Sequence, residues 1–240
     1  MQVFEYHKLH DLPPAACLLS SIWSYHRKRH RTLLKYKSRI CVDGSQQLYG
    51  QDYWDMYAPI IAWSTIWLIL LLTTIMNFQS RQVNYMQAFP QAELTDPDFM
   101  RIPQGCFIDS NKTLQQHLYP HFNDTAHYIK LRHNLYGCKQ VARNRYNHLS
   151  QGILSAGFTQ SKIDPCLFCH SDCFIVLYTD DTLIFAKDDA TIDAVIKTLS
   201  ENFQLEDKGL VSDFLGIQLI HDASSQCIQM TQLGLIKSII

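Results

Sequence analysis

The second half of the chain carries the clearest pattern of apolar and polar positions. Apolar residues recur every three or four positions over 139–156 and again over 189–203, which predicts two amphipathic helices. Gly157 is placed to end the first helix and Asp189 to cap the second. Short apolar runs predict strands at 166–168, 174–178 and 183–186, and later ones at 213–220 and around 226–230.

The first half has weaker periodicity. Residues 22–42 are expected to form two short strands around a basic turn, and alternation predicts a further strand at 81–87. Another short strand is predicted at 99–103, whereas 104–127 have the composition of an irregular loop. The order of these elements indicates an α+β fold in which a sheet carries its helices on one face.

Residues 60–76 form a long apolar segment without a charged residue. The segment lies between Asp55 and Arg81 and is just long enough to be a transmembrane candidate. It also contains serine and threonine, and its length suits a helix that is buried in a protein core. The pattern alone leaves both interpretations open.

Composition narrows the class of protein. The chain has 240 residues, 47% of them hydrophobic, and a formal net charge of −1, which excludes a disordered chain and a nucleic-acid binder that relies on overall basicity. Binding of nucleic acid through a local basic patch is still possible, because residues 26–39 are rich in Lys, Arg and His and contain no acid. The N-terminus lacks the features of a signal peptide and the eight cysteines are irregularly spaced. An intracellular protein, cytoplasmic or nuclear, with reduced thiols is therefore expected.

Two adjacent carboxylates at a predicted hairpin tip are the main chemical signal. They belong to Tyr178-Thr179-Asp180-Asp181, which lies between two strands of buried type, where two acids are costly without a cation. Mg²⁺ prefers oxygen ligands, and template-directed phosphoryl transfer uses two such ions. A solvated Asp-rich turn is the alternative interpretation of the same four residues.

The neighbouring motifs favour the first interpretation, because in their order they resemble the reverse transcriptase domain of copia-type long-terminal-repeat retrotransposons. The resemblance runs from about residue 12 to the C-terminus. Its motifs lie at 36–39 with 42–44, 50–54, 57–59, 81–89, 100–105, 135–140, 164–168, 178–181 and 214–217. Each motif is weak alone, and the series of nine is specific.

The resemblance implies a right-hand polymerase fold with fingers and palm in a single domain over 1–240, in which an antiparallel palm sheet carries helices on one face. Residues from about 12 to 80 would be the fingers-like part, and those from about 81 to 240 the palm-like part with some fingers elements. It further implies an RNA-directed DNA polymerase that uses Mg²⁺, or alternatively Mn²⁺, a primer on an RNA or DNA template, and deoxynucleoside triphosphates. We expect no RNase H, integrase or protease region, and no dedicated protein partner can be inferred. Membrane association is not expected, since the family has a buried helix at 60–76.

The resemblance also assigns roles to particular residues. Asp180 and Asp181 would hold the metal, and Phe89 would be a steric gate against the 2′-hydroxyl of a ribonucleotide. The residues that would bind the nucleotide or border the template are Lys37, Arg39, Phe89, Tyr136, Gly137, Lys139, Gln140 and Arg143. The residues that would position the primer end are Phe214, Leu215 and Gly216.

Asn84 stands where the family has its first catalytic Asp. A neutral amide oxygen cannot supply the charge that holds two Mg²⁺ ions beside a triphosphate, so the rate is expected to fall by on the order of 10³-fold. Asn is nearly isosteric with Asp, so the fold is expected to persist. Two more departures are Trp67, which replaces a basic residue of the family, and Arg145, which replaces a large aromatic residue.

Three alternatives belong beside this interpretation. The domain could be an inactive relic or a non-catalytic module that binds a primer–template through residues 26–39. Cys166, Cys169 and Cys173, with His170, have the spacing of zinc ligands. A single-pass membrane protein through 60–76 is the least favoured alternative.

Overall fold

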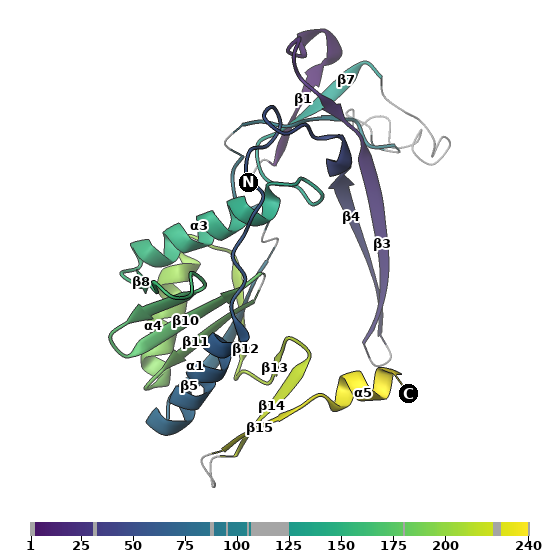
Figure 1. Cartoon of the computed structure of the whole chain (residues 1–240). Helices are drawn as coiled ribbons and strands as arrows, with labels where there is room; N and C mark the ends of the chain where they lie inside the picture. The colour runs from purple at the N-terminus through teal and green to yellow at the C-terminus, as the bar shows by residue number, and fades with distance from the viewer. Residues whose placement is uncertain are drawn as a thin grey trace. The chain divides into compact units, whose positions relative to one another are not determined.

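The structure is a computed structural model that describes residues 3–30, 33–86, 89–94, 96–104, 106, 125–179, 181–222 and 227–239. It divides the chain into two compact units (Figure 1). Unit 1 comprises Met1–Ala58 and Phe89–Arg145, and unit 2 comprises Pro59–Ala88 and Tyr146–Ile240. Each unit is therefore built from segments that are far apart in the sequence.

Unit 1 contains a four-stranded sheet in the order β1-β7-β6-β2 and a separate two-stranded ribbon, β3–β4. Its strands are β1 (Phe4–Lys8), β2 (Leu18–Leu19), β3 (Ser21–His30), β4 (Leu33–Val42), β6 (Phe99–Arg101) and β7 (His127–Leu131), and its 3-10 helices are η1 (Leu9–Asp11) and η2 (Gly44–Gln46). Leu19, Met100 and Leu131 lie in the core of the sheet, and Val42 joins the end of β4 to that core. Apolar packing thus fixes the base of the ribbon. The two strands predicted within 22–42 are confirmed as β3 and β4.

Unit 2 contains a six-stranded antiparallel sheet in the order β12-β5-β11-β10-β9-β8 and a three-stranded sheet in the order β13-β14-β15. The larger sheet consists of β5 (Gln79–Tyr85), β8 (Thr159–Gln160), β9 (Leu167–His170), β10 (Cys173–Tyr178), β11 (Asp181–Ala186) and β12 (Leu205–Gly209). The smaller sheet consists of β13 (Asp213–Phe214), β14 (Ile217–Asp222) and β15 (Cys227–Thr231). The α-helices are α1 (Trp63–Met76), α3 (Val141–Ser155), which begins in unit 1, α4 (Asp189–Ser200) and α5 (Leu233–Ile239).

One face of the larger sheet is covered by α4 and its C-terminal turn. Tyr85 of β5 contacts the ring of Phe203 edge-to-face, with ring centroids 5.6 Å apart. Arg81 points to the same face as Tyr85, because every second residue of a strand lies on the same face of the sheet. Its guanidinium forms ion pairs with Asp189 and Asp207 at 2.7 Å each, which tie β5 to α4 and β12.

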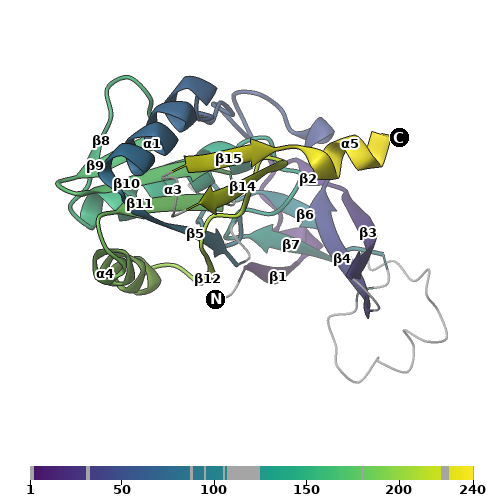
Figure 2. The same cartoon turned by 90° about the horizontal axis from the view of Figure 1, so that it is seen from below.

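The opposite face of the larger sheet is covered by α1 and the smaller sheet (Figure 2). Phe174 of β10 stacks on Phe78, which follows α1, with ring centroids 6.1 Å apart. Tyr178, further along β10 on the same face, contacts the ring of Phe214 in β13 at 5.8 Å. The expectation that all helices lie on one face of the sheet is therefore wrong for α1.

Helix α1 is buried on one side and exposed on the other. Its inward side chains are Thr65, Ile66, Ile69, Leu70 and Thr73, whereas Trp67, Leu71 and Ile75 are exposed. Asp164 fixes the start of the helix, because its carboxylate accepts hydrogen bonds from the Ala62 amide at 2.9 Å and the Thr65 hydroxyl at 2.7 Å. Across the described part of the chain, no helix combines the length and apolar character that a membrane span requires.

Most predicted helices and strands occur with their ends shifted by a few residues. The second amphipathic helix is capped by Asp188, not Asp189, since the Asp188 carboxylate accepts a hydrogen bond from the Thr191 amide at 2.7 Å. The strand predicted at 213–220 is divided into β13 and β14 by a turn. The strands that were not predicted include β1, β7 and β12, and much of the predicted loop at 104–127 lies outside the described residues.

Candidate functional site

Asn84, where the resemblance implies an Asp, lies directly opposite the hairpin that is predicted to bind the metal in unit 2. Asn84 of β5 is the cross-strand partner of Asp181 at the start of β11. The two side chains therefore leave the sheet on the same face, where directly opposed Cβ atoms are about 5 Å apart. Gln82, two residues earlier on β5, shares this face, and its amide donates a hydrogen bond to Asp181 Oδ1 at 3.2 Å. Sequence reasoning assigned no role to Gln82, although its two-residue spacing from Asn84 places it on the same face.

The hairpin itself is tight. Tyr178 pairs with Asp181 at the end of the hairpin that joins β10 to β11. Thr179 has φ of 42°, which is strained for a β-branched residue. Asp180, the other predicted metal ligand, lies outside the described residues.

The predicted primer-positioning residues form the turn of a second hairpin in unit 2. Phe214 pairs with Ile217, which leaves Leu215 and Gly216 as its two-residue turn. Their φ angles are 55° and 76°, the combination of left-handed residues that a type I′ turn requires. Phe214 is buried and contacts the Tyr178 ring, so this turn packs against the strand that leads to Thr179.

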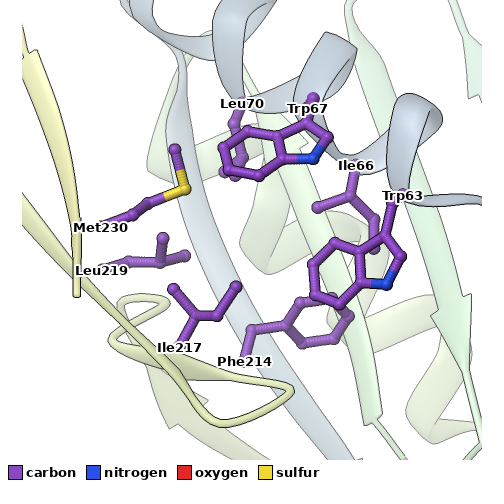
Figure 3. A pocket seen from close by; sticks show the side chains of 8 residues that line it. All are labelled: Trp63, Ile66, Trp67, Leu70, Phe214, Ile217, Leu219 and Met230. Carbon is purple, nitrogen blue, oxygen red and sulfur yellow. The ribbon is translucent and has the colours of Figure 1, made fainter. Parts of the chain in front are cut away.

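An apolar pocket lies between α1 and the β13–β15 sheet (Figure 3). Its lining consists of Trp63, Ile66, Trp67 and Leu70 from α1 and of Phe214, Ile217, Leu219 and Met230 from the smaller sheet. Trp67, for which the resemblance implies a basic residue, is half-exposed and lies near Trp63, with ring centroids 6.5 Å apart. In this chain the position therefore makes an apolar contact.

Three of the predicted nucleotide-binding residues meet in unit 1. The Arg39 guanidinium lies 5.3 Å from the centre of the Tyr136 ring. Phe89 contacts the same tyrosine edge-to-face at 4.9 Å, and Arg145 lies 5.9 Å from the centre of the Phe89 ring. Alternating cations and aromatic rings stabilise one another and offer both charge and a flat surface to an anionic ligand that carries a ring.

The remaining predicted nucleotide-binding residues also lie in unit 1. Lys37 is exposed on β4, two residues before Arg39. Lys139 lies over the Tyr53 ring at 4.8 Å, and Arg143 forms an ion pair with Asp55 at 3.3 Å. Gln140 is buried and its amide bonds to Asp98, so its side chain supports the site from within the unit.

A buried carboxylate holds the segment that contains Lys139 and Gln140. Asp98 Oδ2 accepts hydrogen bonds from the side-chain amides of Gln47 at 3.0 Å and Gln140 at 2.9 Å. Gln47 in turn accepts a hydrogen bond from the Lys139 backbone amide at 2.7 Å. Burial raises the pKa of Asp98 to about 6, although these hydrogen bonds oppose the shift. Sequence reasoning missed Asp98 and Gln47, which no motif or periodicity marks.

Gly137 lies where the Tyr136–Gly137 turn meets the end of β4. Its φ is 97°, and a Cβ atom on it would overlap the carbonyl oxygen of Val42. Gly44 faces this turn, and a Cβ atom there would overlap the carbonyl oxygen of Gly137. The Val42 amide donates a hydrogen bond to the Tyr136 carbonyl at 2.7 Å, so the two backbones are in direct contact. Gly137 therefore permits the close approach that places Tyr136 beside Arg39.

Exchange of Asp98 for Asn is expected to remove a pH dependence of stability. The pKa of Asp98 is raised from 3.8 to about 6 in the fold, so the folded protein binds this proton more tightly than the unfolded chain. The contribution of Asp98 to the free energy of unfolding is fully present at a pH below its pKa in the unfolded chain. This contribution, about 3 kcal/mol, is lost as the pH rises through about 6. Asn keeps an acceptor oxygen for both glutamine amides and does not titrate.

Urea unfolding of the Asp98→Asn variant and the unchanged protein, measured from acidic to neutral pH, checks this expectation. The difference in unfolding free energy should shift in favour of the variant as the pH rises. A difference that stays constant across this range contradicts it, because every other titrating group is common to both proteins.

The cysteines with zinc-ligand spacing lie on or next to strands β9 and β10. Cys173 pairs with His170, and Cys169 pairs with Phe174. Burial raises the pKa of both Cys166 and Cys173 to about 12. Within the described ranges, no three Cys, His, Asp or Glu residues are grouped in a way that could hold a metal ion.

The chain matches the protein family described as "Reverse transcriptase (RNA-dependent DNA polymerase)" over residues 4–240. It is 26% identical over 233 residues to the Retrovirus-related Pol polyprotein from transposon TNT 1-94 of Nicotiana tabacum, which covers 94% of this chain and 17% of the polyprotein. It is 30% identical over 213 residues to the Retrovirus-related Pol polyprotein from transposon RE1 of Arabidopsis thaliana, which covers 86% of this chain and 14% of the polyprotein. The chain thus spans less than a fifth of the length of these relatives.

More distant similarity extends to yeast elements and to solved structures. The Transposon Ty1-ER2 Gag-Pol polyprotein of Saccharomyces cerevisiae is 23% identical over 215 residues, which are 84% of this chain and 11% of the polyprotein. The structure of telomerase from Candida albicans in complex with the TWJ fragment of telomeric RNA matches with a TM-score of 0.39 and 9% identity, over 72% of this chain and 34% of the telomerase chain.

Proposed function

Because this chain belongs to the reverse transcriptase (RNA-dependent DNA polymerase) family, we propose that it is a copia-type polymerase domain whose nucleotidyl transfer is impaired at Asn84. The observation that carries the proposal is the direct pairing of Asn84 with Asp181 across β5 and β11. An acid at position 84 would complete a cluster of carboxylates on one face of a rigid sheet. In this chain an amide occupies that position, within a regular antiparallel register of β5 and β11.

In this proposal unit 2 is the palm and unit 1 supplies fingers elements. Unit 2 contains the hairpin with Asp181 and the turn at Leu215 and Gly216, which would support the primer end. Unit 1 contains Arg39, Tyr136 and Phe89, whose charge and rings suit the triphosphate and sugar of a deoxynucleotide.

The donor set suits one divalent cation better than two. Asp181 offers a carboxylate, and Asn84 opposite it offers a neutral amide oxygen, both hard ligands of the kind that Mg²⁺ and Mn²⁺ accept. Asp180 and Asp181 would hold such an ion, which when bound supplies charge stabilisation for phosphoryl transfer. Asn84 contributes no charge to a second ion, so the expected loss is in the rate of transfer and not in the binding of the primer–template.

A non-catalytic module that binds a primer–template is the second candidate. The ribbon β3–β4 favours it, because His26, Lys37 and Arg39 lie on one face of a segment that contains no acid. Such a surface neutralises phosphates and releases their counterions, so binding depends on ionic strength and does not require an intact metal site.

Binding and extension measured on one labelled RNA–DNA primer–template test the proposal. We expect the unchanged protein to bind with an affinity that falls steeply with salt, and to extend the primer only weakly in Mg²⁺. Exchange of Asp181 for Asn should abolish the residual extension and leave binding unchanged. No binding at low salt overturns both candidates, and residual extension that survives Asp181→Asn overturns the assignment of the metal site.

A further inference from the structure

Helix α1 leaves one apolar side exposed. Leu68, Leu71 and Ile75 are 51%, 57% and 70% exposed, and Trp63 and Trp67 are each 47% exposed. A helix that is apolar all round is normally buried, and a contiguous exposed apolar surface marks a site of interaction with another macromolecule. The exposed side of α1 therefore fits a partner that packs along the helix.

The most exposed positions of α1 have the spacing of a helix-pairing seam. Ser64, Leu68, Leu71 and Ile75 follow one another at intervals of four, three and four residues, and all four are exposed. This is the spacing of the a and d positions of a coiled coil, which places the side chains in one line along the helix. We call these four residues the α1 seam. Its spacing indicates that the partner is itself a helix.

The α1 seam is complementary to a second copy of itself in antiparallel orientation. Leu68 of one copy would then lie opposite Leu71 of the other, and Ser64, the smallest of the four, would lie opposite Ile75. A parallel pair would instead place the two serines together and the two isoleucines together, which fills the space less evenly. Antiparallel helices also bring each N-terminus next to a C-terminus of opposite partial charge.

Charge and area agree with a partner of this kind. Residues 56–80 contain no charged residue, so two copies of this side meet without repulsion between like charges. Its five large exposed side chains, at about 100 Å² each, would bury on the order of 1,000 Å² in total when two copies meet. That area is at the lower limit for a specific interface, as expected for a reversible dimer.

We propose that the chain forms a symmetric homodimer in which the α1 seams of two copies pack antiparallel. A twofold axis across the helices makes the contact isologous, so the same residues serve on both sides and the assembly closes at two copies. The proposal goes beyond the proposed function and does not rest on it, because the contact involves neither nucleic acid nor metal.

Sedimentation equilibrium of the full chain over a range of micromolar concentrations tests the dimer. We expect the average mass to rise with concentration from 27.8 kDa, the mass of one copy, towards twice that value. Leu71→Lys should raise the dissociation constant by at least about tenfold, because it places unpaired charges in the apolar contact. Leu210→Lys is the matched control, since Leu210 is 53% exposed and lies outside α1, and it should leave the dissociation constant unchanged.

Two double variants test the antiparallel pairing. Leu68→Lys with Leu71→Glu places opposite charges face to face in an antiparallel dimer, whereas Leu68→Lys with Leu71→Lys places like charges there. Both introduce two charged residues at the same positions. The variant with opposite charges should therefore dimerise at least about tenfold more tightly than the variant with like charges. In a parallel dimer each position would meet itself, and both variants would be repelled.

Four results would overturn the proposal. A mass of one copy at every concentration excludes the dimer, and a dimer that Leu71→Lys leaves intact uses another surface. Equally weak association of the two double variants excludes antiparallel pairing. A single copy that binds phosphatidylcholine vesicles, and loses this binding in Leu71→Lys, would assign the exposed side of α1 to a lipid surface. Melting temperatures equal to that of the unchanged protein confirm that the variants keep the fold.

Discussion

Primer extension on an RNA template is expected to increase by on the order of 10³-fold when Asn84 is exchanged for Asp. The new carboxylate would lie directly opposite Asp181, on the same face of the sheet, without a change in side-chain volume. It restores one negative charge at the place where two cations and a triphosphate would have to be accommodated. The measurement compares rates of nucleotide addition for the two proteins in Mg²⁺ at equal enzyme and primer–template concentrations.

The control for this prediction is a second substitution in the same strand pair. Asp181→Asn in the Asn84→Asp background returns the number of carboxylates to that of the present chain, so the gain should disappear. Equal extension by the unchanged protein and Asn84→Asp would contradict the metal argument. Absence of extension in both, with both proteins folded and bound to primer–template, would contradict the prediction that one carboxylate restores activity. That outcome would favour the non-catalytic module.

The regular elements could be predicted because their periodicity reflects the burial of one face. The strands that became β10 and β11 are nearly continuous apolar runs, as expected for strands covered on both faces. Strand β12 is different, because its sequence, Leu-Glu-Asp-Lys-Gly, has no apolar alternation. It forms because Glu206 and Asp207 pair with Asn84 and Val83 at the edge of the sheet, a long-range contact that no local pattern records.

A motif can name candidate residues in the sequence, whereas a residue that is important because it is buried leaves no such sign. The resemblance named Tyr136 and Arg39 as candidates, and the structure places the two side chains in contact, while their role stays a prediction. Asp98 was missed, because a carboxylate in a polar sequence context gives no sign of burial. Only the fold places Gln47 and Gln140 around it, from segments 51 and 42 residues away.

Segment 60–76 shows the same limit. Its composition is uniform around the helix, so the sequence could not reveal which side is buried. In the structure Ile66 and Leu70 face the core, whereas Leu71 and Ile75 face away from it. Contacts with other segments determine which side of α1 is buried, including the hydrogen bonds that Ala62 and Thr65 donate to Asp164. Because Asp164 is about a hundred residues away in the sequence, no local pattern reveals this contact.

Exchange of Gly137 for Ala is expected to destabilise unit 1 by about 4 kcal/mol or more, which is exceptional for the addition of one methyl group. Two effects add. The residue has φ of 97°, where a Cβ atom is strained, and that atom would also overlap the Val42 carbonyl. The overlap is with backbone, which cannot rotate away as a side chain can, so the Tyr136–Gly137 turn would have to separate from β4. Tyr136 would then be displaced from Arg39, and unfolding in urea should begin at a lower concentration.

Gly50→Ala separates these two effects within the same unit. Gly50 has φ of 80°, but the nearest atom to a Cβ there is in the Trp54 side chain at 3.7 Å, an ordinary contact distance. This control should therefore lose only about 1–2 kcal/mol, the cost of a left-handed conformation. Equal losses in the two variants would show that the backbone contact between Gly137 and Val42 contributes nothing. A much larger loss in Gly137→Ala identifies that contact as the constraint that holds the Tyr136–Gly137 turn against the ribbon.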